Sequence, residues 1–209
     1  GGIDVLWVGA RTTVNPFMVQ EIADALEGTN TPVLVKNPVN PDVELWIGAI
    51  ERLQTAGTTK IGAIHRGFST FQKSPFRNSP NWNIPIELKR RMPNLPIICD
   101  PSHICGTREL LGEVAQKAID LSMDGLMIET HRSPKEAWSD ADQQVTPDDL
   151  NRILKNLVWR NPSSQDLEVK AKLEELRATI DGLDRDILDL ILERLDVSRD
   201  IGEYKKAHS

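Results

Sequence analysis

The sequence predicts an α/β fold, in which parallel strands alternate with helices, followed by one long helix. Short apolar runs recur at intervals of about 30 residues, the usual length of one strand–helix unit. Amphipathic segments lie between these runs. Toward the C-terminus, Gly and Pro become rare and the apolar residues follow a heptad-like spacing. With 209 residues, the chain can form one large domain or two smaller ones.

Five apolar runs are expected to form the strands. They cover residues 3–8, 33–35, 61–64, 97–99 and 126–128. Because the strands alternate with helical patterns, they are expected to pair in parallel.

Helix-start signals support four helices between and after the strands. These helices are expected at residues 16–26, 42–56, 107–121 and 146–157. The first has Asn15 before Pro16, and the last opens with Thr146 followed by Pro and two Asp residues. Both are typical N-terminal signals. Residues 67–84 are polar and rich in Pro, Asn and Ser, so a long loop is expected there.

Charged or metal-binding side chains follow every expected strand. These side chains are Arg11, Lys36, His65 with Arg66, Asp100 with His103, and Glu129 with His131. In (β/α)8 barrels, the carboxyl ends of the strands meet on one rim, where the active site lies. The pattern therefore predicts part of such a TIM barrel, with a site on that rim.

Three of these side chains are cations that predict an anion site. The guanidinium groups of Arg11 and Arg66 offer paired donors that match phosphate and carboxylate, and Lys36 adds a point charge. A small phosphorylated acid is the natural ligand. The alternative is that each cation pairs with a neighbouring Asp or Glu.

A second group predicts a metal site. His103 and Glu129 follow neighbouring strands, and Asp140 lies in a loop that can fold over the same end. One imidazole and two carboxylates suit a divalent metal such as Mn, Fe or Zn. The alternative is a His–Glu hydrogen bond without metal. His65 and His131 are expected to make hydrogen bonds rather than to bind the metal.

The composition narrows the classes of partner. There are 25 Lys and Arg residues against 31 Asp and Glu residues, so no basic excess points to nucleic acid. The two cysteines, Cys99 and Cys105, do not make a disulfide framework, which favours a reducing, cytoplasmic setting. No apolar run reaches the roughly 18 residues that span a membrane, and no signal peptide is evident.

Five short strings, in order, resemble a known family. They are GARTT at 9–13, VLVKNP at 33–38, HRGFSTF at 65–71, DPSH at 100–103, and GLMIETH with a following SD at 125–140. Together they are similar to the type I 3-deoxy-D-arabino-heptulosonate 7-phosphate (DAHP) synthases. The resemblance implies a (β/α)8 barrel that condenses phosphoenolpyruvate with erythrose 4-phosphate.

The resemblance also implies roles for individual residues. Phosphoenolpyruvate is expected to be bound by Arg11, Lys36 and Arg66, and a divalent ion (Mn, Fe, Zn or Co) by His103, Glu129 and Asp140. Lys36 and His103 are expected to be catalytic. The nearest alternative is a related synthase that makes 3-deoxy-octulosonate 8-phosphate. Its substrate, arabinose 5-phosphate, would distinguish the two in an assay.

The chain also departs from the family pattern. The family barrel has eight strand–helix units, whereas this sequence shows five, which resemble strands four to eight. The family's metal-binding Cys and its Lys-Pro-Arg-Thr motif come from the first two strands, and Cys99 and Cys105 lie elsewhere. A chain truncated at its N-terminus is therefore expected. Such a chain is either part of a working synthase or an inert partial polypeptide.

The C-terminal segment has an apolar seam typical of a long packed helix. The seam consists of Leu173, Leu176, Ile180, Leu183, Ile187, Leu190, Val197, Ile201 and Tyr204. Arg194 interrupts it, so this Arg either reaches solvent, forms an interhelical ion pair, or holds an anion inside a helical bundle. Lys205 lies about three turns further on the same face, whereas Arg177 lies on another face.

This segment is similar to the first helix of an all-α chorismate mutase of the AroQ class. The matching residues are Leu176-Arg177, Ile180-Asp181, Asp184, Leu188, Leu190-Ile191, Arg194, Ile201-Gly202 and Lys205. The resemblance implies that Arg194 and Lys205 bind chorismate in one site, and that Arg177 serves the site of a partner subunit. All three are expected to be catalytic in the rearrangement to prephenate. The alternative is a regulatory or dimerising helix without turnover.

The expected organisation has two domains. Residues 1–160 form the C-terminal part of the barrel, 161–165 are a linker, and 166–209 form the first mutase helix, whose further helices are missing. The expected partners are small-molecule substrates, with no nucleic acid and no membrane. A homodimer or higher homo-oligomer in the cytoplasm is expected.

Overall fold

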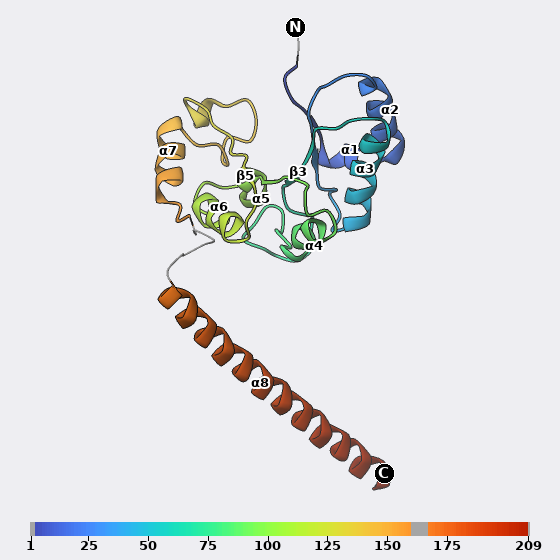
Figure 1. Cartoon of the computed structure of the whole chain (residues 1–209), viewed down its shortest axis with the longest axis vertical. Coiled ribbons are helices and arrows are strands. Elements are labelled where there is room, and N and C mark those ends of the chain that lie inside the picture. Colours follow the sequence, from blue (N-terminus) through green and yellow to red (C-terminus); the bar gives the residue numbers. More distant parts are fainter. Residues whose placement is uncertain (1–2, 160–166, 209) are drawn as a thin grey trace. The chain divides into compact units, whose positions relative to one another are not determined.

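The computed structural model describes residues 3–159 and 167–208 of the chain (Figure 1). It divides into two compact units, Gly1–Arg160 and Asn161–Ser209, which are described separately below. None of the helices in the described ranges combines the length and the apolar character that a membrane crossing requires.

The first unit is built on a five-stranded sheet. Its strands are β1 (Leu6–Val8), β2 (Val33–Lys36), β3 (Ile61–His65), β4 (Ile97–Cys99) and β5 (Gly125–Leu126). The strands pair in the order β1-β2-β3-β4-β5, and every pair is parallel. The predicted α/β fold with a parallel sheet is thereby confirmed. After β5 in the sequence, Thr130 and Val145 form an isolated parallel bridge outside the five strands.

Helices connect these strands (Figure 1). The longer ones are α2 (Pro16–Leu26), α3 (Val43–Thr55), α4 (Asn83–Arg91), α6 (Leu111–Asp120) and α7 (Pro147–Asn156). The predicted caps are present. The side chain of Asn15 accepts hydrogen bonds from two backbone N–H groups of α2, and the hydroxyl of Thr146 accepts one from Asp149.

Several elements differ from the sequence expectation. Helix α3 is capped by Asp42, whose carboxylate accepts bonds from two backbone N–H groups, so the helix begins at residue 43. Residues 107–110 precede α6 instead of belonging to it, and β5 ends at Leu126. Three helices were not expected. Helices α1 (Ala10–Thr13) and α5 (Pro101–Cys105) are short and follow strand ends directly, and α4 (Asn83–Arg91) lies before β4.

The core of this unit lies between the sheet and its helices. Trp46 on α3 is fully buried, and its indole N–H donates to the carbonyl of Val35 on β2 at 3.0 Å. Helices α2, α3 and α4 pack in sequence beside each other, and α6 packs against α7. A second cluster around Leu111 and Val114 fills the space between β4, α5 and α6. This packing holds the strand ends in fixed positions.

The second unit is one continuous helix, α8 (Leu167–Ala207). The long C-terminal helix is confirmed. The described members of its apolar seam are exposed, with Leu190 at 64% and Ile201 at 52% of their full exposure.

Candidate functional site

A cavity of about 500 Å³ lies at the carboxyl ends of the first strands. It is lined by Arg11 from α1, Lys36 at the end of β2 and Arg66 just after β3. Its wall also includes Trp7, Arg77, Asn78 and His103. The structure therefore brings the three predicted cations to one cavity. Four cationic side chains around such a volume favour a small, multiply charged anion.

Asp100 connects this cavity to His103. Its Oδ2 lies 3.3 Å from Lys36 Nζ and 2.9 Å from His103 Nδ1, and its Oδ1 accepts a 3.0 Å bond from the His103 backbone N–H. Burial would raise the pKa of Asp100, but the His103 ring, that N–H and Lys36 together hold it below its ordinary value. Lys36 therefore pairs with a neighbouring acid, and its side chain also lines the cavity.

Arg66 is oriented by two asparagines. Its backbone N–H donates to Asn37 Oδ1 at 2.6 Å, and its Nη1 donates to Asn78 Oδ1 at 2.9 Å. Asn78 in turn donates from Nδ2 to the carbonyl of His103 at 2.6 Å. Burial lowers the pKa of Arg66, although the nearby Asp100 opposes this change. One buried amide thus links the cation cavity to α5.

His103, Glu129 and Asp140 lie together beside this cavity. One potential ligand atom from each lies within 4.8 Å of the others. The buried Nδ1 of His103 lies 2.9 Å from Asp100 Oδ2, although the two groups are not aligned as in a normal hydrogen bond. One imidazole and two carboxylates fit a divalent transition metal. A carboxylate such as Asp100 beside the imidazole is typical of metal-binding histidines.

Neighbouring side chains hold both acidic residues. The backbone N–H of Glu129 donates to Ser102 Oγ at 2.9 Å. Arg77 donates from Nη1 to Asp140 Oδ1 at 2.7 Å, and this bond lowers the pKa of Asp140. Gln143 lies between Arg77 and Glu129. Arg77, Asn78 and Gln143 could not be predicted from the sequence, because they lie in loop-like segments and no spacing marks them.

Family comparison agrees with this geometry. Residues 2–164 match the DAHP synthetase I family, and residues 176–209 match chorismate mutase type II. The chain belongs to the DAHP synthetase I family. The mutase match covers the described part of α8 from Leu176 onward, so both predicted resemblances are confirmed.

Individual relatives support the same assignment. A phospho-2-dehydro-3-deoxyheptonate aldolase of Thermotoga maritima is 31% identical over 142 residues, which cover 68% of this chain and 40% of that protein. A solved truncated DAHP synthase from Thermotoga maritima has 28% identity and a TM-score of 0.63, covering 73% of this chain and 56% of that one. The chain thus spans less than half the length of the curated relative.

A weaker match concerns the alternative function. A 2-dehydro-3-deoxyphosphooctonate aldolase of Vesicomyosocius okutanii is 33% identical over 78 residues, which is 32% of this chain and 28% of that protein. The longer match to the heptonate enzyme and the family match favour the DAHP synthase assignment.

The remaining histidines and cysteines of the DAHP synthetase segment lie outside the candidate metal site formed by His103, Glu129 and Asp140. His65 is fully buried, and burial lowers its pKa to about 3. His131 Nδ1 accepts a 3.0 Å bond from the backbone N–H of Ser133. Burial raises the pKa of the Cys105 thiol to about 12, and that of Cys99 well above its ordinary value. Neither cysteine is poised as a thiolate ligand.

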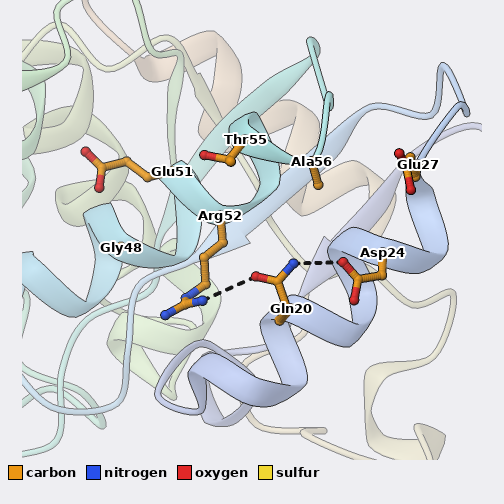
Figure 2. Close-up of a pocket in the computed structure, with 8 residues that line it drawn as sticks. All are labelled: Gln20, Asp24, Glu27, Gly48, Glu51, Arg52, Thr55 and Ala56. Atoms are coloured by element: carbon orange, nitrogen blue, oxygen red, sulfur yellow. Dashed lines mark hydrogen bonds between the residues drawn. The ribbon is translucent and has the colours of Figure 1, made fainter.

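Another hollow, of about 470 Å³, lies between α2 and α3 (Figure 2). Three of its polar side chains bond to one another. Arg52 donates to Gln20 at 3.2 Å, and Gln20 donates to Asp24 at 2.8 Å. Figure 2 shows Arg52 of α3 meeting Gln20 of α2, which bonds to Asp24 on its own helix. The hollow contains none of the predicted site residues and reads as a surface cleft between packed helices.

The predicted mutase residues lie on α8. Arg194 and Lys205 are both exposed on this helix. The side chain of Arg177 lies outside the described residues. The structure thus brings together the predicted DAHP synthase residues, while it leaves the three mutase residues on one helix.

Proposed function

We propose that this chain supplies the phosphoenolpyruvate- and metal-binding residues of a DAHP synthase. The reaction is the condensation of phosphoenolpyruvate with erythrose 4-phosphate to DAHP and phosphate. The observation that carries the proposal is the His103, Glu129 and Asp140 cluster beside a cavity lined by cationic side chains. Family membership supports it.

Each group of residues has a role in this reaction. Arg11, Lys36 and Arg66 hold the phosphate and carboxylate of phosphoenolpyruvate, so that C3 of the enol faces the sugar aldehyde. C3 then bonds to the aldehyde carbon, water adds at C2, and phosphate leaves. His103, Glu129 and Asp140 hold a divalent ion (Mn, Fe, Zn or Co), which supplies Lewis-acid polarisation of the aldehyde oxygen when bound.

The same protein is proposed to carry a chorismate mutase. Residues 1–160 belong to the barrel, 161–165 are the linker, and 166–209 are the first mutase helix. On that helix, Arg194 and Lys205 bind chorismate in one site and Arg177 serves another, which requires a homo-oligomer. The family match over residues 176–209 supports this assignment. A cytoplasmic setting suits these metabolites.

The test is binding of metal and of phosphoenolpyruvate to the 209-residue chain, measured by calorimetry. Wild type is expected to bind one Mn²⁺ or Co²⁺ per chain. His103→Ala is expected to weaken this binding by more than about 100-fold, because even residues behind the ligands contribute about 10- to 100-fold. His208→Ala, at the end of α8, is the matched control and keeps the wild-type affinity.

Phosphoenolpyruvate binding tests the cation cavity separately. Arg66→Ala is expected to weaken it by about 10- to 100-fold, since a charged hydrogen bond contributes about 1.5–3 kcal/mol. Arg152→Ala, on the exposed face of α7, serves as the control. If the folded wild type binds no divalent ion at this site, or if His103→Ala leaves ion binding unchanged, the proposed metal site is wrong.

A further inference from the structure

Gln143 is a buried residue of the candidate metal site, and its carboxamide lies between Glu129 and Arg77. Only 1% of its surface is exposed. Its Nε2 donates to Glu129 Oε2 at 2.9 Å, and its Oε1 accepts from Arg77 Nη1 at 2.8 Å. A buried amide with both ends bonded has a fixed orientation. No motif in the sequence gives this residue a role.

The chemistry of the two partners sets the orientation of the amide. Arg77 can only donate hydrogen bonds, and the carboxylate of Glu129 can only accept them. The amide oxygen must therefore face Arg77, and the amide nitrogen must face Glu129. With the amide reversed, its N–H donors would face the donors of Arg77, and its oxygen would face the carboxylate of Glu129. The bridge is thus directional.

Arg77 extends the bridge to the second carboxylate. The Nη1 that donates to Gln143 also donates to Asp140 Oδ1 at 2.7 Å. Backbone bonds hold the segments in place, because the Val145 N–H donates to the Glu129 carbonyl at 3.1 Å and Gln143 donates to the Asp140 carbonyl at 3.1 Å. Gln143 and Arg77 therefore connect Glu129 to Asp140.

The bridge leaves one oxygen of Glu129 for the ion. Oε2 is engaged by Gln143, whereas Oε1 points toward His103 and lies 3.6 Å from its Nδ1. We infer that Gln143 is a positioning residue of the metal site: it commits Oε2 and so presents Oε1 as the single ligand oxygen of Glu129. The inference rests on the proposed function, because it assumes that the cluster binds a divalent ion.

The test is a titration with Co²⁺, followed by its visible absorption, on the whole chain. Gln143→Met keeps the length of the side chain but removes both hydrogen bonds. It is expected to weaken Co²⁺ binding by about 10- to 100-fold, the range for residues that orient metal ligands. The Co²⁺ spectrum is also expected to change, because both oxygens of Glu129 become free to coordinate.

Two further variants make the test specific. Gln116→Met is the matched control, since Gln116 bonds to Asp120 and to the Val158 backbone, away from the metal cluster. It is expected to lower stability but to keep the Co²⁺ affinity and spectrum. Gln143→Asn keeps a carboxamide that is one methylene too short to reach both partners. It is expected to weaken Co²⁺ binding, and it carries the test if Gln143→Met does not fold.

The outcomes separate this inference from the proposed function. If a folded Gln143→Met variant keeps the wild-type Co²⁺ affinity and spectrum, Gln143 does not position Glu129, but the proposed metal site still stands. If wild type binds no Co²⁺ and His103→Ala changes nothing, the proposed function fails as well. An equal loss of Co²⁺ affinity in Gln116→Met would assign the effect to stability and would also overturn the role of Gln143.

Discussion

Gly67, directly after Arg66, occupies a position that no other residue fits well. Its φ is +77°, and a Cβ built on it would lie 2.6 Å from the carbonyl oxygen of Asn78. Asn78 bonds both to Arg66 and to the backbone of His103. The missing side chain of Gly67 therefore lets the residue that orients Arg66 approach the strand end closely.

Replacing this glycine should affect both stability and anion binding. Gly67→Ala is expected to lower the free energy of unfolding by about 2–5 kcal/mol, since a positive φ costs about 1–2 kcal/mol and a forced backbone shift costs about 1–3 kcal/mol. Because Asn78 must move, phosphoenolpyruvate binding should weaken too. Urea denaturation and calorimetry provide the two measurements.

Gly57→Ala is the matched control for this substitution. Gly57 has a φ of +93°, but nothing lies within 4 Å of a Cβ built there. The free energy of unfolding of Gly57→Ala is expected to fall only by the backbone cost of a positive φ, about 1–2 kcal/mol. This variant should keep wild-type phosphoenolpyruvate binding. Equal losses of stability in the two variants would show that the approach of Asn78 does not restrict residue 67.

At the residue scale, the sequence predicts which side chains gather but not what orients them. Arg11, Lys36 and Arg66 could be placed on one edge because parallel strands align their carboxyl ends. Gln143 and Asn78 could not be placed, because their partners lie far away in the sequence. Their contacts depend on how the two loops fold over the sheet. No local pattern encodes that path.

At the element scale, prediction succeeded where the chain carries explicit start signals. Helices α2 and α7 begin where Asn15 and Thr146 cap them. Helix α4 follows Trp82, which makes no side-chain cap, and the sequence does not predict this helix. Helix α6 follows Leu110, also without a side-chain cap, and its start was set too early. Packing against neighbouring elements, rather than local chemistry, determines these two starts.

The cap of α2 gives a prediction at this scale. Asn15→Ala removes the acceptor of the N–H groups of Phe17 and Met18, which lie 3.1 and 3.3 Å away. It is expected to lower the free energy of unfolding by about 1 kcal/mol. Thermal or urea denaturation followed by circular dichroism measures this change.

Asn30→Ala controls for the substitution itself. Asn30 lies in the exposed connection between α2 and β2, and no capping bond involves it. A change within about 0.5 kcal/mol is expected there. If Asn15→Ala were equally neutral, the cap would contribute nothing to stability, and the sequence signal would have no energetic basis.

At the scale of the whole sheet unit, His65 lies at the centre of the fold. It ends β3, the middle strand of the sheet, and is fully buried. Its ring packs near Trp46, Phe68 and Trp82, with centroid distances of 6.5, 5.7 and 5.1 Å. The backbone of Pro80 favours the protonated ring, but among the described residues no group makes a hydrogen bond of normal geometry to either ring nitrogen. The folded unit therefore holds this imidazole neutral.

This burial makes the stability of the unit depend on pH. Burial lowers the pKa of His65 from its ordinary 6.5 to about 3, although the charge of Asp100 opposes the shift. Between these values the unfolded chain binds a proton that the folded chain does not. The free energy of unfolding should therefore fall as the pH drops below about 6.5, by about 1.4 kcal/mol per pH unit, until about pH 3.

His65→Leu isolates this contribution. The leucine side chain suits the aromatic surroundings and removes the titrating group, so the stability at pH 7 should change by less than about 1.5 kcal/mol. Between pH 6.5 and pH 5, wild type should lose about 1.6 kcal/mol more than the variant, because the unfolded histidine is already half protonated at pH 6.5. Urea denaturation at a series of pH values measures both slopes. Parallel slopes would mean that His65 is hydrated or hydrogen-bonded in the folded protein, and that the acid sensitivity of the sheet arises from its carboxylates instead.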